Sequence, residues 1–219
     1  MGIVDIGIHL PKLPTDGARA PLKPSTLREW LSVTWDTPNH EVVATAPVLT
    51  GLFGTEVAHL AASWIEKENG DQFIRLPHRA KCVAQTDGPC QNCRKYRDGH
   101  FSPVRRARRI PVHDDRLAKL LQVLATEQEQ LGLHDVYGSI KMMVDRSSIQ
   151  RDVSLRAFRN THGVAIAAKG YTRREIHRWM GNDPDADYGH MNFAKDYRTV
   201  AETSPWDELE ALGTGEFRP

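Results

Sequence analysis

Apolar residues recur at helical spacing along most of the chain. The clearest case is residues 114–132, in which Leu117, Leu120, Leu121 and Leu124 stand at positions i, i+3, i+4 and i+7. Because this spacing places side chains on one face of a helix, the segment predicts an amphipathic helix that stops at its closing glycine.

Four other segments also predict helices: "PSTLREWLSV" with Ser25 as N-cap, residues 39–65, residues 138–150 and residues 155–182. The long apolar segment is interrupted at Gly51, so it predicts two buried helices joined by a turn. The last segment predicts a helix, a glycine turn and a second helix.

Two short segments have the composition of strands. "DQFIRLP" and "RRIPV" are apolar or β-branched at alternate positions and predict a small antiparallel sheet at one edge of a mostly helical α+β domain. Between them, residues 78–107 form a basic insert that carries the cysteines.

Composition divides the chain into three parts. Residues 1–24 are rich in Pro and Gly and predict a loosely ordered lead-in, residues 25–200 form the domain, and residues 201–219 form an acidic tail. The chain has neither an apolar run of 18 residues nor a signal-like N-terminus. We therefore expect a cytoplasmic protein that does not enter a membrane.

Charge is strongly segregated, although the formal net charge is only +1. Residues 75–109 contain ten Lys or Arg against two Asp, whereas residues 200–219 contain five acidic groups against one Arg. The basic stretch predicts contact with a nucleic-acid phosphate backbone, which binds without reading sequence. A solubilising surface run is the alternative. The candidate contact residues are Arg94, Lys95, Arg105, Arg106, Arg108 and Arg109.

The three cysteines lie within twelve residues of one another, in the pattern C-x7-C-x2-C formed by Cys82, Cys90 and Cys93. The odd count argues against a disulfide framework, and the "CQNC" step after Gly-Pro is typical of structural zinc sites. The fourth ligand would be His100, His78 or, less suitably, Asp98. Buried thiols without metal are the alternative.

Two strings resemble the sequence boxes of the tyrosine recombinases, the phage and plasmid integrase family. "TGLFGTEVAHLAASWI" resembles the first box, T-G-L-R-x-S-E-L, which a strand follows in that family. "LRAFRNTHGVAIAAKGYTRREIHRWMGN" resembles the second and third boxes, H-x-L-R-H-T and L-G-H. The resemblance covers residues 25–200 and implies the family's catalytic-domain fold, a helical bundle with a three-stranded antiparallel sheet at one edge.

In that family a tyrosine attacks a DNA phosphodiester and forms a 3′-phosphotyrosyl link without a metal or nucleotide cofactor. Two arginines bind the phosphate oxygens, and a lysine and a histidine assist proton transfer. The lysine position falls near Val104, where the neighbouring Arg105 is a poor proton donor.

The resemblance carries over only part of this chemistry. The family's second arginine corresponds to Arg159 and its box-two cation to Arg156, and their spacing predicts that both project from one helix face. The first arginine, however, falls at Phe53, and the box-three histidine falls at Asn182.

The family's nucleophile position falls near Met191, and "FAKDY" favours Tyr197 over Tyr188 if the preceding loop is longer than in the family. His190 would then take the histidine role if that loop folds back.

Loss of one oxyanion-stabilising donor typically costs about 2.7–4 kcal/mol of barrier. The sequence therefore predicts a nucleoid-associated protein that binds duplex DNA, is impaired in strand cleavage, and acts as a regulator or as the partner of another copy or of an active integrase. One alternative is an active integrase that uses Tyr197, and another is a zinc-stabilised protein-interaction module.

Overall fold

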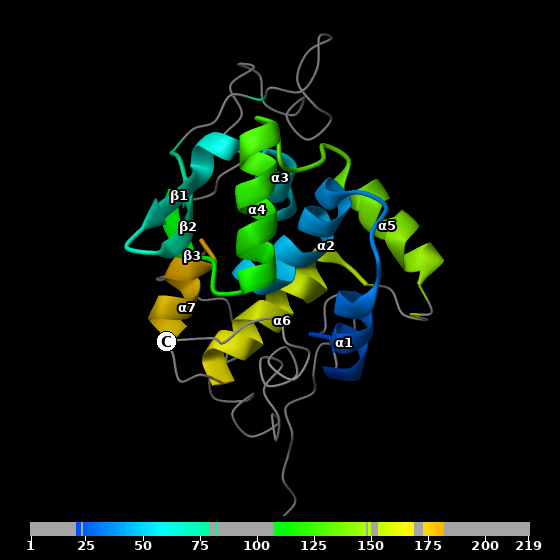
Figure 1. Cartoon of the computed structure of the whole chain (residues 1–219). Helices are drawn as coiled ribbons and strands as arrows, with labels where there is room; N and C mark the ends of the chain where they lie inside the picture. The colour runs from blue at the N-terminus through cyan, green and yellow to red at the C-terminus, as the bar shows by residue number, and fades with distance from the viewer. Residues whose placement is uncertain are drawn as a thin grey trace, which may run out of the picture.

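The computed structural model describes residues 21–22, 24–78, 82, 107–147, 149, 153–168 and 173–181 (Figure 1). The helices in these residues are α1 (Pro24–Ser32), α2 (Pro38–Thr50), α3 (Gly54–Ala58), α4 (Asp115–Glu127), α5 (Val136–Arg146), α6 (Leu155–Ala168), α7 (Arg173–Trp179) and the short 3-10 helix η1 (Ala62–Trp64). The strands are β1 (Ile65–Glu68), β2 (Asp71–Leu76) and β3 (Arg108–Pro111). The predicted class, a mostly helical α+β fold with a small three-stranded antiparallel sheet, is confirmed.

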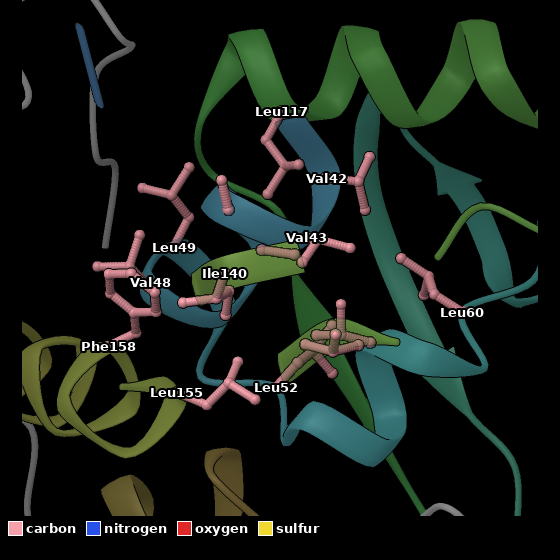
Figure 2. Close-up of a cluster of buried hydrophobic side chains, with 14 of the residues drawn as sticks. Val42, Val43, Val48, Leu49, Leu52, Leu60, Leu117, Ile140, Leu155 and Phe158 are labelled. Atoms are coloured by element: carbon pink, nitrogen blue, oxygen red, sulfur yellow. The ribbon is translucent and has the colours of Figure 1, made fainter. Parts of the chain in front are cut away.

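Helix α2 is the centre of the core. All of its residues from Val42 to Thr50 are buried, and it packs against α3, α4, α5 and α6. Figure 2 shows its side chains among those of the neighbouring helices, which include Leu117, Ile140, Leu155 and Phe158. Complete burial of one such side chain contributes about 1.5–3 kcal/mol, so this packing fixes how α6 lies relative to the turn after α2.

That turn begins at Gly51, where φ is 70° and the backbone N–H donates to the Pro47 carbonyl at 3.1 Å. The left-handed conformation suits glycine. A Cβ there would also lie only 2.7 Å from Cδ2 of His162 on α6. Glycine therefore lets α6 pack closely against the end of α2.

The three strands form an antiparallel sheet in the order β1-β2-β3, at the edge of the helical bundle beside α7 (Figure 1). Ile74 of β2 pairs with Ile65 on one side and with Ile110 on the other. Buried and more exposed residues alternate along β2, as expected for a strand with one face on the core. Strand β1 lies where the first box of the resemblance implies a strand.

The predicted helical segments correspond to observed helices, with one difference. After Gly51 the second apolar helix ends at Ala58, and the chain continues through η1 into β1 rather than remaining helical to residue 65. None of the helices in the described ranges is long and apolar enough to cross a membrane.

Candidate functional site

Arg159 of α6 joins three segments that are far apart in the sequence. Its Nε donates to the Gly51 carbonyl at 2.8 Å, and one terminal nitrogen donates to the Met180 carbonyl at 2.7 Å. Its guanidinium carbon lies 3.2 Å from the centroid of the Phe53 ring. The turn after α2, the helix α6 and the end of α7, which carry the three quoted boxes, therefore meet at one guanidinium.

Phe53 thus has a definite role at the position where the resemblance expects the first arginine. Its ring stacks on the Arg159 cation, an arrangement worth about 0.5–2 kcal/mol. An aromatic face attracts a cation but does not bind a phosphate oxygen. The side chain at position 53 therefore stacks on Arg159 and does not provide a second group that could bind an anion.

A second arginine, Arg108 of β3, also approaches the end of α7. Its Nε donates to the Trp179 carbonyl at 2.7 Å, and its two terminal nitrogens bind the Glu56 carboxylate at 2.7 and 2.8 Å. The exposed fractions of the two side chains are only 5% and 0%. The sequence predicted Arg108 as a DNA contact, but the structure directs it inward, with its charge compensated by Glu56.

Glu56 belongs to this site, and no pattern in the sequence pointed to it. Its carboxylate also accepts a hydrogen bond from the backbone N–H of Phe53 at 2.8 Å, at the start of α3, where helix geometry supplies no backbone acceptor for the first N–H groups. The same carboxylate therefore holds both the first box and β3 in place.

Gly181 lies directly after this junction, with φ of 67°. A Cβ at this position would collide with the Arg108 guanidinium. The glycine of the third box thus gives Arg108 access to Glu56 and to the end of α7.

His162 is buried one turn beyond Arg159, and it is a packed core residue. Its Nδ1–H donates to the Val48 carbonyl at 3.2 Å. Burial is the main cause that lowers the pKa of His162 to about 3; the Val48 hydrogen bond opposes this shift, and the nearby cations Arg159 and Arg108 contribute to it. The imidazole is therefore neutral at pH 7 and does not supply an acid at this site.

This lowered pKa predicts a pH-dependent stability. Above pH 6.5 His162 is neutral in both states, whereas between pH 6.5 and about 3 only the unfolded chain takes up the proton. His162 should therefore lower the free energy of unfolding by about 1.4 kcal/mol for each pH unit of acidification in this interval. Urea denaturation at a series of pH values measures the slope.

His162→Asn is the matched variant for this experiment, because its amide can still donate to the Val48 carbonyl. Its stability should fall less steeply than that of the wild-type protein below pH 6.5. Asp114 has the opposite effect on the pH dependence of stability. Burial raises its pKa to about 6, and its contribution to stability is lost as the pH rises through that value. Because Asp114 is present in both the wild-type protein and the variant, identical slopes of stability against pH in the two would contradict the role given to His162.

Arg156 and Arg159 differ in environment despite their helical spacing. Arg156 is exposed, whereas Arg159 is partly buried and directed at the end of α7. The prediction that both guanidinium groups project together from one helix face is therefore wrong. Arg156 remains a surface cation on α6.

Arg109 of β3 lies at the surface of the sheet. It pairs with Glu66 at 3.3 Å and with Glu68, and its guanidinium lies 3.6 Å from the centroid of the Phe73 ring. Arg75 of β2 also pairs with Glu66, at 3.0 Å. Exposed pairs of this kind contribute about 0–1 kcal/mol, so a competing anion can displace them.

A third group of chemically active side chains lies at the end of α3. His59 Nε2 is 3.3 Å from Cys82 Sγ, and the imidazole of His134 packs edge-on against that of His59 with ring centroids 5.6 Å apart. Burial lowers the pKa of both histidines. Within the described ranges, no three His, Cys, Asp or Glu side chains are arranged to hold a metal ion.

Several residues assigned from the sequence lie outside the described residues: Arg94, Lys95, Arg105, Arg106, Cys90, Cys93, His100, Asn182, Tyr188, His190, Met191 and Tyr197. The site therefore consists here of Arg159 with Phe53, Arg108 with Glu56, and the carbonyls that end α7.

Comparison of the chain with protein-family models, with curated proteins and with solved structures gives no match. The resemblance to tyrosine recombinases thus rests on the quoted boxes.

Proposed function

We propose that this protein binds duplex DNA on a tyrosine-recombinase-like scaffold and is impaired in strand cleavage. In this role it regulates, or assembles with, an active integrase. The observation that carries the proposal is the meeting of the three box segments at Arg159, together with the presence of Phe53 where a second phosphate-binding cation is expected.

The impairment follows from how the arginines are used. Arg159 donates to two backbone carbonyls, and hydrogen bonds to charged groups contribute about 1.5–3 kcal/mol each. Arg108 has its charge compensated by Glu56. A phosphate in its transition state needs donors aimed at its oxygens, and both guanidinium groups are engaged by the protein itself.

The binding part is supported by charge. The stretch 79–107, which leaves out the paired Arg75, Arg108 and Arg109, has seven Lys or Arg against two Asp, and α6 adds the exposed Arg156. Contacts of this type release counterions from DNA, so the affinity depends strongly on salt and weakly on sequence.

Fluorescence anisotropy of a labelled duplex with the full chain tests the binding. We expect the logarithm of the association constant to fall linearly with the logarithm of salt concentration, by about 0.9 for each phosphate neutralised. Arg156→Ala should weaken binding and reduce this slope by about one phosphate contact. Lys141→Ala, which removes an exposed cation from α5, is the matched control and should leave both unchanged.

A nicked suicide duplex, which traps a covalent phosphotyrosyl adduct, tests the impairment separately. The expected result is salt-sensitive binding without an adduct. Binding that does not respond to salt would remove the DNA-binding proposal. An adduct that disappears in Tyr197→Phe would instead establish the alternative, an active integrase.

A further inference from the structure

The outer face of the sheet carries two arginines that bind the same carboxylate. Arg75 of β2 and Arg109 of β3 are directly opposite each other in the antiparallel register, on the face that points away from the core. Nη1 of Arg75 lies 3.0 Å from Oε1 of Glu66, and Nε of Arg109 lies 3.3 Å from Oε2. Each oxygen of the carboxylate is therefore next to a different guanidinium.

The strand pairing explains why the two guanidinium groups converge on an anion. Like charges directly opposite each other on neighbouring strands destabilise a sheet, and an anion between them offsets the repulsion. Glu66 lies opposite Phe73, and the Arg109 guanidinium lies 3.6 Å from the centroid of the Phe73 ring. This stacking orients Arg109, which also pairs with Glu68. The two cations are thus arranged around the position of one small anion.

The pairs with Glu66 are open to solvent. The exposed fractions of the side chains are 71% for Arg75, 39% for Arg109 and 30% for Glu66. Those of the neighbouring pair between Arg108 and Glu56 are only 5% and 0%. Because exposed ion pairs contribute little free energy, another anion can exchange with Glu66. Arg109 is therefore the arginine of β3 that an external anion can reach.

The position of the arginine pair on the sheet favours a nucleic-acid phosphate as that anion. Arg75 and Arg109 lie one residue pair from the end at which β2 leads into the basic stretch 79–107 and β3 follows it. The carboxylates of Glu68 and Asp71 are paired at the opposite end. The cationic end of this face is thus the one that is continuous in the chain with the basic stretch, which suits a polyanion.

We propose that a DNA phosphodiester takes the place of the Glu66 carboxylate between Arg75 and Arg109, and that Glu66 is an internal competitor that limits this contact. This role of Glu66 rests on the DNA binding proposed above and adds a control to it. A phosphodiester presents two non-bridging oxygens, as the carboxylate does, so each guanidinium keeps one acceptor. Because Glu66 must be displaced first, it lowers the affinity for DNA.

Glu66→Gln in the full chain tests the competition, because it removes the charge and keeps the size of the side chain. An exposed pair accounts for up to about a fivefold change in an equilibrium constant, and Glu66 makes two such pairs. We therefore expect the variant to bind a labelled duplex about 3- to 25-fold more tightly than the wild-type protein at about 0.1 M salt. The salt dependence should be steeper by about 0.9, the value for one phosphate.

Asp145→Asn is the matched control, since it removes one exposed negative charge from α5, which lies on the other side of the bundle from the sheet (Figure 1). Screening at this salt concentration should keep its effect on the affinity below about twofold. Circular dichroism and urea denaturation check that each variant is folded, as expected because surface pairs contribute little to stability.

A second background separates release of the arginines from simple loss of a negative charge. In Arg75→Gln/Arg109→Gln, the addition of Glu66→Gln should raise the affinity by less than about twofold, because no guanidinium remains to be released. The full gain in this background would overturn the proposal, as would an equal gain in Asp145→Asn.

The negative results differ in meaning. If the wild-type protein binds the duplex in a salt-sensitive manner and Glu66→Gln binds no more tightly, Glu66 is not a competitor, while the proposed DNA binding stands. If neither protein binds the duplex, both proposals are wrong. A gain of affinity for polyglutamate but not for the duplex would assign the face to an acidic protein and would also overturn the proposal.

Discussion

Replacing Glu56 with Gln is expected to lower the free energy of unfolding by about 3–5 kcal/mol, because it leaves the buried Arg108 cation without its counter-charge. The substituted side chain keeps the volume of the original. The effect would therefore come from charge and hydrogen bonding rather than from packing. Urea denaturation followed by circular dichroism measures it.

The double variant Glu56→Gln/Arg108→Met is the control. Removing both charges should recover much of the lost stability, since replacement of a buried ion pair by groups of similar volume is often close to neutral. Arg109→Met, in the same strand but at the surface, should change stability by no more than about 1 kcal/mol. An unaltered urea midpoint for Glu56→Gln would contradict the pairing.

Trp30→Ala is expected to lower the free energy of unfolding by about 3–5 kcal/mol. Trp30 is fully buried, its ring lies 4.8 Å from that of Phe158 and 5.0 Å from that of Trp35, and its indole N–H donates to the Ala44 carbonyl at 3.1 Å. The substitution leaves a large cavity between α1, α2 and α6 and removes the donor to Ala44. Thermal and urea denaturation measure the change.

Two further substitutions separate these contributions. Trp30→Phe keeps an aromatic ring but removes the hydrogen bond and part of the volume, so its effect should be smaller than that of Trp30→Ala. Trp35→Ala alters a partly buried ring and should also have a smaller effect. Equal losses for Trp30→Ala and Trp35→Ala would show that burial at position 30 is not what matters.

The helices could be predicted because amphipathic periodicity is a local property of the sequence. In α4, for example, the predicted stripe contains Leu117, Leu121 and Leu124, and all three are buried. The end of α3 was harder to predict, because the apolar residues after it continue without a break into η1 and β1. There the strand pairing with β2, rather than the local sequence, determines the structure.

The candidate site could be predicted less fully, because its partners are distant in sequence. Strand alternation places Arg108 on the same side of β3 as the buried Ile110, so the sequence did contain a signal that this arginine points inward. It could not identify Glu56, 52 positions earlier, as its partner. The four arginines within residues 105–109 instead indicated that all of these side chains are exposed.

Arg159 illustrates a second limit. Its partners include the carbonyls of Gly51 and Met180, and backbone acceptors leave no trace in side-chain patterns. The resemblance identified the arginine, whereas only the folded chain shows where its donors are directed. The contact of His59 with Cys82 was missed for a similar reason, since 23 residues separate them.

Two consecutive carbonyls at the end of α7 accept hydrogen bonds from different arginines. Arg108 donates to the Trp179 carbonyl, and Arg159 donates to the Met180 carbonyl. An anion that recruits Arg159 must therefore compete with the backbone of this helix end. Anion binding and detachment of α7 from α6 are thereby thermodynamically linked. A ligand that draws the Arg159 guanidinium away from the Met180 carbonyl weakens the attachment of the end of α7, just before Gly181. A covalent link that holds this end of α7 in place would lower the affinity for that ligand by the same factor.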